Sequence, residues 1–281
     1  MKIAYLGPEN TFTENITKKL FPEDELIPIK PIRKVIQAVE LGNVDKGIVP
    51  IENFYSGEVI ETLDALTEVS RTRIIESIGF SIKHCLGTLP ENSEIKKIFS
   101  KDQAINQCSK YLCENYPNVE TISVSSTSEA VNRIKNENML DAGAIASEEA
   151  LLNNNLKILS KEICPNNKTR FAILGNEETK PTGDDKTFLT FHPVKDRPGI
   201  LQSCLGFFSN LGINLDYIQS RPDGKGGYRF YIELKGHEKD KAVKIAIKSL
   251  KYSLDSEDNY QEVVKILGSF PNTDWKKNNK I

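Results

Sequence analysis

With 281 residues, of which 38% are hydrophobic and 27% charged, the chain is long enough for two domains that each bury a core, and its composition is that of a folded protein. The formal net charge of -2 leaves no basic field to hold nucleic acid or an anionic membrane, so we expect neither partner. The lysines of the last residues, Lys276 to Lys280, are interpreted as part of a solvated tail.

Cysteine usage and the amino terminus indicate the compartment. The five cysteines are odd in number and form no C-x-x-C pair, which predicts reduced thiols rather than a disulfide framework or a zinc site. The chain opens directly on a strand-like run at residues 2–6, without the basic and apolar segments of a leader peptide. No apolar run approaches the length of a membrane span, so we expect a cytoplasmic protein.

Short apolar runs alternate with helical patterns through the first half of the chain. The expected strands are Ile3–Leu6, Leu26–Ile29, Gly47–Ile51, Ile95–Phe99, Val119–Val124 and Ala142–Ala146. The expected helices are Thr11–Leu20, Pro31–Leu41, Lys101–Asn115 and Ser126–Asn138. This alternation predicts an α/β fold of parallel βαβ units. We expect a strand pair near Arg73–Leu86 to carry the chain into a second lobe, and a return near Leu156–Leu174 to close the first.

The second half of the chain begins with a change of composition. Residues 175–186 hold no apolar side chain large enough to anchor a core, which is typical of a linker. After it we expect a strand, a helix, two strands, a helix and a strand, at Thr187–Pro193, Gly199–Leu211, Asn214–Arg221, Tyr228–Lys235, Lys239–Ser253 and Gln261–Gly268. A glycine-rich connection at 222–227 joins the middle strands. The order βαββαβ predicts a ferredoxin-like unit.

Three strand-to-helix junctions share the pattern of a capping box. They are Thr11-x-x-Glu14, Ser100-x-x-Gln103 and Ser126-x-x-Glu129. A helix start leaves backbone N–H groups unpaired and carries partial positive charge. In parallel α/β folds such starts lie where ligands bind, so converging starts favour a carboxylate ligand. The same boxes also serve simply to stop helices from fraying, and both interpretations stay open.

Other candidates are polar residues beside predicted strands. Asn53 follows a buried strand and is either a cleft amide or a turn residue. Alternation places His84 on one face with Phe80 and Leu86, which favours a core histidine over a catalytic one. Residues 166–171 are interpreted as a loop running into a strand. Metalloprotease, P-loop, dinucleotide, nucleophile-elbow and Cys/His motifs are all missing, so we expect no metal, cofactor or covalent mechanism.

The motifs, taken in order, resemble those of one family. The segments are Tyr5–Thr13, Val49–Asn53 with Gly57 and Val59, Gln103–Cys108, Thr169–Phe171, Arg197–Leu201 and Ser220–Pro222. Together they resemble the monofunctional prephenate dehydratases over almost the full length of the chain. The resemblance implies a two-lobed catalytic domain of the periplasmic-binding-protein type (type II), followed by a ferredoxin-like ACT regulatory domain. It also implies loss of carbon dioxide and ring hydroxide from prephenate to give phenylpyruvate, with phenylalanine as effector and a homodimer or homotetramer.

The resemblance further implies roles and boundaries. Catalysis is expected from Thr169, either as the donor to the leaving hydroxyl or by ordering a water that donates, with Asn53, Arg170 and Phe171. Arg170 is expected to organise the lobe junction rather than to bind substrate. Substrate contacts are expected from Thr11, Ser56, Gly57, Ser100, Gln103, Ser126 and Thr127. Phenylalanine contacts are expected from Arg197, Gly199, Ile200, Leu201, Ser220, Arg221 and Pro222. The expected boundaries are residues 1–178 for the catalytic domain (lobe one 1–80 and 160–178, lobe two 81–159), 179–186 for the linker, 187–271 for the ACT domain and 272–281 for the tail.

One departure from the family pattern keeps alternatives open. Phe54 stands where the family has serine directly after the Glu-Asn pair, and Ser56 lies two residues further on. Loss of a hydroxyl at this point would weaken assistance to the departing hydroxide. A non-aromatising prephenate decarboxylase is therefore one alternative, and a catalytically inactive sensor of aromatic amino acids is another.

Overall fold

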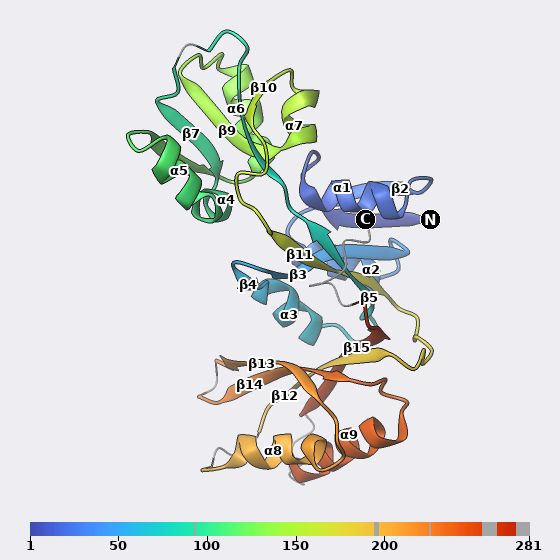
Figure 1. Cartoon of the computed structure of the whole chain (residues 1–281). Helices are drawn as coiled ribbons and strands as arrows, with labels where there is room; N and C mark the ends of the chain where they lie inside the picture. The colour runs from blue at the N-terminus through green and yellow to red at the C-terminus, as the bar shows by residue number, and fades with distance from the viewer. Residues whose placement is uncertain (93, 194–196, 225, 255–262, 274–281) are drawn as a thin grey trace.

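Three sheets follow one another along the molecule, each with its own helices (Figure 1). The computed structural model describes residues 1–92, 94–193, 197–224, 226–254 and 263–273. The predicted tail lysines, Lys276 to Lys280, and the predicted strand start at Gln261 lie outside these residues. No helix in the described ranges is both long and apolar enough to cross a membrane.

The first sheet, in the middle of Figure 1, forms lobe one. Its strand order is β2-β1-β3-β11-β5, and β4 pairs with β3. The strands are β1 (Lys2–Leu6), β2 (Glu25–Ile29), β3 (Lys46–Asn53), β4 (Gly57–Glu58), β5 (Arg73–Ser81) and β11 (Lys168–Gly175). The helices are α1 (Phe12–Leu20), α2 (Ile32–Glu40) and α3 (Ile60–Thr67). β1 runs parallel to β2 and β3, as the βαβ pattern predicts, whereas β11 runs antiparallel to β3 and β5.

The second sheet forms lobe two, with strand order β10-β6-β9-β7-β8. Its strands are β6 (His84–Thr88), β7 (Lys97–Lys101), β8 (Glu120–Val124), β9 (Ala142–Ser147) and β10 (Lys157–Ser160). Its helices are α4 (Asp102–Gln107), α5 (Ser109–Asn115), α6 (Thr127–Asn136) and α7 (Glu148–Asn153). The single helix predicted over Lys101–Asn115 is wrong, because the chain breaks at Cys108 into two short helices.

The chain crosses between the lobes twice, from β5 to β6 and from β10 to β11. The crossing segments are hydrogen-bonded to each other: Ile82 N donates to Asn167 O (2.8 Å) and Ile163 N donates to His84 O (2.9 Å). This two-lobed arrangement with paired crossings is that of the type II periplasmic-binding-protein fold. Side chains at the crossings therefore lie between the two lobes.

The third sheet belongs to the βαββαβ unit predicted for the C-terminal part. The elements are β12 (Asp185–Phe191), α8 (Ile200–Ser209), β13 (Leu215–Pro222), β14 (Tyr228–Lys235), α9 (Lys241–Leu254) and β15 (Val264–Pro271). The order β13-β14-β12-β15, antiparallel throughout, is ferredoxin-like. Alternation along each strand fills both faces: Leu189 and Ile232 pack with the helices, while Phe188 and Tyr231 join the core of lobe one. Figure 1 shows α8 and α9 on the side away from lobe one.

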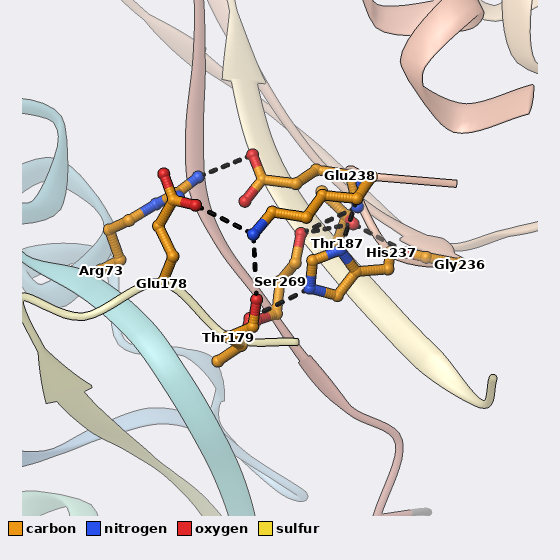
Figure 2. A network of polar contacts seen from close by, with 9 residues as sticks. Arg73, Glu178, Thr179, Thr187, Gly236, His237, Glu238 and Ser269 are labelled. Atoms are coloured by element: carbon orange, nitrogen blue, oxygen red, sulfur yellow. Dashed lines mark hydrogen bonds and ion pairs between the residues drawn. The ribbon is translucent and has the colours of Figure 1, made fainter. Parts of the chain in front are cut away.

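The backbone of the C-terminal sheet packs directly against the backbone of lobe one. A Cβ atom added to Gly268 on β15 would lie 2.1 Å from the carbonyl oxygen of Ile74 on β5, so only glycine permits this crossing. Figure 2 shows that the connecting segment is also fixed to the C-terminal unit. Thr179 Oγ1 lies 3.1 Å from His237 Nε2, and Arg73 pairs with Glu238 at 2.8 Å. Part of the predicted linker is thus packed structure rather than a free tether.

Candidate active site

A cavity of about 510 Å³ lies between the two lobes. Its lining combines apolar side chains with helix starts, hydroxyls and amides: Leu6, Gly7, Pro8, Thr11, Phe12, Thr13, Lys30, Pro31, Ile32, Pro50, Asn53, Val59, Glu61, Ile82, His84, Lys101, Gln103, Ala104, Gln107, Ser125, Ser126, Thr127, Thr169 and Phe171. The lining contains two lysines and one glutamate, so its formal charge is positive, whereas the formal charge of the whole chain is negative. The cavity therefore suits a small anion with an apolar body.

Two of the three predicted capping boxes form, and both lie in the cavity lining. Thr11 accepts a hydrogen bond from Glu14 N (3.3 Å) at the start of α1, and Ser126 accepts one from Glu129 N (3.1 Å) at the start of α6. Hydrogen bonds from the hydroxyl and backbone N–H of Ser125 lower the pKa of the Glu129 carboxyl. The two helix starts belong to different lobes, so they border the cavity from opposite sides.

The third predicted box does not form. β7 continues to Lys101, and α4 begins at Asp102 without a side-chain cap. Ser100 is fully buried, and its hydroxyl donates to Ile145 O (2.7 Å) in the neighbouring strand β9. Ser100 does not line the cavity, and its hydroxyl is engaged with β9, so its expected substrate contact stays a prediction. Gln103 does line it, and its Nε2 donates to Ser56 Oγ (3.0 Å) across the lobes.

Asn53 is the centre of the polar contacts. Its Oδ1 accepts hydrogen bonds from the backbone N–H groups of Tyr55 and Ser56, both at 3.0 Å. These backbone donors fix the amide, so Nδ2 faces the other way, where its two hydrogens are shared among Asn167 Oδ1 (2.9 Å), Thr169 Oγ1 (3.0 Å) and Lys168 O (3.1 Å). Because Thr169 Oγ1 accepts this hydrogen bond, its own hydrogen is left for a group in the cavity. Asn53 and Thr169 are 4% and 8% exposed, so the pair is shielded from bulk water.

Gln107 was not among the predicted site residues, although it lies in the network around Asn53. Its Nε2 donates to Asn53 Oδ1 (2.9 Å) and to Ser56 Oγ (3.0 Å). Its Oε1 accepts from Asn167 Nδ2 (2.9 Å) and lies 3.0 Å from His84 Nε2. A usable signal was present, because Gln103 and Gln107 are four residues apart on one helix and so share a face. Their common partner, Ser56, was not predictable.

The loop after Asn53 closes as a tight hairpin. Asn53 pairs with Gly57 between β3 and β4, and Gly57 has φ +73°, which favours glycine. Gly57 does not line the cavity, and its predicted contact with substrate stays a prediction. Phe54 is 56% exposed, and its ring meets that of Tyr55 edge-on at 5.6 Å, outside the lining. Ser56 also lies outside the lining, and its hydroxyl accepts hydrogen bonds from Gln103 and Gln107 across the lobes.

Arg170 points away from the cavity. Alternation along β11 sends Thr169 and Phe171 into the lining and Arg170 to the other face of the sheet. There the guanidinium pairs with Glu233 of β14 at 2.5 Å and donates to Ser77 Oγ at 3.2 Å. Arg170 is therefore not among the residues that reach substrate. It joins the lobe-one sheet to the C-terminal sheet instead of the two lobes to each other.

The residues expected to bind an effector fall on two elements of the C-terminal unit. Arg197 and Gly199 precede α8, where Gly199 is the left-handed cap (φ +78°), and Ile200 and Leu201 form the first turn. Ser220, Arg221 and Pro222 end β13, the edge strand of the sheet. Arg221 also pairs with Asp64 of α3 at 3.4 Å. The described ranges contain no cluster of three or more His, Cys, Asp or Glu side chains suited to a metal ion.

These features define a two-lobed α/β enzyme for a small anionic substrate, coupled to a ferredoxin-like regulatory unit. A family model described as prephenate dehydratase matches residues 3–179, and one described as ACT domain matches residues 194–251. The chain belongs to the prephenate dehydratase family. It carries an ACT domain at its C-terminal side.

Known proteins agree with this assignment. A bifunctional chorismate mutase/prephenate dehydratase of Pseudomonas aeruginosa is 38% identical over 280 residues, covering 96% of this chain and 73% of that protein. The prephenate dehydratase of Lactococcus lactis is 31% identical, covering 96% and 97% of the two chains. The crystal structure of prephenate dehydratase from Arthrobacter aurescens, in complex with L-Phe, matches with a TM-score of 0.87 at 29% identity, covering 98% and 91%.

Proposed function

We propose that this chain converts prephenate to phenylpyruvate by coupled loss of carbon dioxide and hydroxide. Decarboxylation sends an electron pair into the ring, and the ring becomes aromatic when hydroxide leaves from the opposite carbon. The protein must orient the substrate and give a proton to the departing oxygen. The hydrogen bond from Asn53 to Thr169 carries this proposal, because it directs the threonine proton into the cavity. Phe171 lies in the same lining as an apolar wall for the ring.

The charges of the cavity suggest how the substrate is oriented. The carboxylate that leaves as carbon dioxide loses its charge in the transition state, so a cation held against it would oppose the reaction. The carboxylate of the pyruvyl side chain keeps its charge and can be gripped throughout. We assign this second carboxylate to the side of the cavity with the capped starts of α1 and α6, at Thr11, Ser126 and Thr127. Lys30 and Lys101 add positive charge to the lining.

Turnover of prephenate by the purified chain tests the reaction directly. The ultraviolet spectrum is expected to change to that of phenylpyruvate. A dihydro-hydroxyphenylpyruvate product would instead establish a non-aromatising decarboxylase, and an unchanged spectrum would leave an inactive sensor. The position of Phe54 supports the dehydratase, because its side chain lies outside the cavity lining and so replaces no group there.

Regulation and assembly form the second part of the proposal. We infer that phenylalanine inhibits the enzyme by binding at the ACT domain, through the segments Arg197–Leu201 and Ser220–Pro222, and that copies associate through the exposed edge of β13. The proposed division is 1–178 for the catalytic domain, 179–184 for the linker and 185–271 for the ACT domain, because β12 begins at Asp185 rather than at the expected residue 187. Ser220→Ala is expected to weaken inhibition by phenylalanine while basal activity is kept. Light scattering is expected to give a dimer or tetramer, and a monomer would refute the edge pairing.

A further inference from the structure

His84 occupies the crossing between the lobes and borders the cavity. It is the first residue of β6, is 3% exposed, and its ring meets the Phe12 ring edge-on at 5.3 Å. Its Nε2 lies 3.0 Å from Gln107 Oε1. Its Nδ1 is buried and has no hydrogen-bond partner among the described residues. Nε2 of the ring therefore has a hydrogen-bond partner, whereas Nδ1 has none among the described residues.

A chain of fixed amides determines which nitrogen of His84 carries the hydrogen. The backbone N–H groups of Tyr55 and Ser56 can only donate, so Asn53 Oδ1 must be the oxygen. Gln107 approaches that oxygen and must present its NH₂ group, which turns Gln107 Oε1 toward His84 and Asn167. An oxygen can only accept, so His84 Nε2 must be the N–H donor. The hydrogen on His84 follows, step by step, from two backbone amides.

This tautomer leaves Nδ1 as a buried acceptor without a donor, which destabilises the folded chain. Phenylalanine would fill the same space without that cost, so packing alone does not account for a histidine here. We propose that His84 is a positioning residue for the reaction: its Nε2–H holds the Gln107 carboxamide in the orientation that keeps Asn53 directed at Thr169. This inference rests on the proposed dehydratase reaction. Burial also lowers the pKa of His84, which keeps the ring neutral and the tautomer defined.

The role of His84 is indirect, through Gln107. Gln107 Oε1 has two donors, Asn167 Nδ2 and His84 Nε2. Without the His84 donor, the Gln107 carboxamide can rotate away from Asn53 and Ser56. This rotation removes one hydrogen bond from Asn53 Oδ1. Asn53 then holds the Thr169 oxygen less firmly. The expected loss is in kcat rather than in KM, because the leaving-group contact develops in the transition state.

Three substitutions at one position separate this role from packing. His84→Phe keeps the ring and removes the donor, His84→Gln places an amide N–H near the position of Nε2, and His84→Asn places one near that of Nδ1. His84→Phe and His84→Asn are expected to lower kcat about tenfold with little change in KM, the effect of one lost hydrogen bond. His84→Gln is expected to recover most of kcat. The urea midpoint of His84→Phe should equal or exceed that of the original chain, since the unpaired nitrogen is gone.

Nitrogen NMR of the chain labelled at its three histidines tests the tautomer without any assay of activity. The His84 ring, assigned by its loss in His84→Phe, is expected to carry its hydrogen on Nε2. A hydrogen on Nδ1, a wild-type kcat in His84→Phe, or equal losses in His84→Gln and His84→Phe would each overturn the proposal. A loss of kcat that follows the unfolded fraction would also do so. Absence of turnover in the original chain would refute the dehydratase reaction, and the NMR result would then still decide the hydrogen position.

Discussion

The ion pair between Arg170 and Glu233 offers a sharp test of how the ACT domain is held. The two side chains are 5% and 3% exposed, and Glu233 Oε1 also pairs with Lys186 at 3.0 Å. Glu233→Gln keeps the shape of the side chain but removes its negative charge. The new amide NH₂ group must then face one of two donors, Arg170 or Lys186. Breaking a buried pair from one side costs about 3–5 kcal/mol. We expect about 3 kcal/mol here, because Glu52 still lies 3.7 Å from the guanidinium.

Urea unfolding, followed by fluorescence and circular dichroism, measures this cost. Glu68→Gln is the matched control, because it removes the same charge from the pair with Arg33, whose side chains are 42% and 58% exposed. Exposed pairs contribute less than about 1 kcal/mol and weaken with salt. The Glu233→Gln effect should exceed that of Glu68→Gln at every ionic strength. Equal effects within about 0.5 kcal/mol would refute the reasoning that burial makes the Arg170 pair costly to break.

Three further predictions concern the cavity and the domain contact. Thr169→Ala is expected to lower kcat about 10²-fold or more with a small change in KM, while Thr169→Ser keeps most activity; steady-state kinetics that show an unchanged kcat in the alanine variant would remove the hydroxyl from its role. Gly268→Ala is expected to destabilise the folded chain by about 1–3 kcal/mol. Gly206→Ala, at a helix position with nothing within 4 Å, is the control and is expected to stabilise the folded chain by about 0.5–1 kcal/mol. Thermal melts that give the same sign for both variants would contradict the close approach at Ile74. The lowered pKa of His84 predicts a free energy of unfolding that decreases as the pH falls below about 6.5, because the unfolded chain takes up a proton more readily than the buried ring; urea unfolding at several pH values is expected to show a smaller decrease for His84→Gln, and an equal decrease in both chains would contradict this.

Local sequence patterns correctly predicted the features that depend only on residues close together in the chain. The βαβ units, the βαββαβ order and the caps at Thr11 and Ser126 are all properties of short segments, and the structure confirms them. The cap at Ser100 failed because β7 runs two residues beyond the predicted end at Phe99, alongside β8, so the helix begins at Asp102. Sheet pairing decided this boundary, and the local sequence does not contain it.

Residues that act through distant partners were harder to predict. Gln107, Asn167 and His84 meet only because the two chain crossings lie side by side, and their separations along the chain reach 83 positions. His84 fits the pattern of a buried strand residue, which it is, and nothing local indicates that one of its nitrogens faces an amide. Arg170 likewise has its charged partner 63 residues away, on a strand of another sheet.

The use of amides rather than charged groups beside Thr169 follows from the chemistry. A carboxylate at position 53 would accept the Thr169 hydrogen and turn it away from the leaving oxygen, and its charge would repel a dianionic substrate. A lysine would donate to Thr169 but would also stabilise the carboxylate whose charge must be lost. An amide does neither, because it presents an N–H to Thr169 while its oxygen is occupied by Tyr55 and Ser56. Backbone N–H groups fix this direction without adding charge, so the positive charges in the lining can serve the carboxylate that stays.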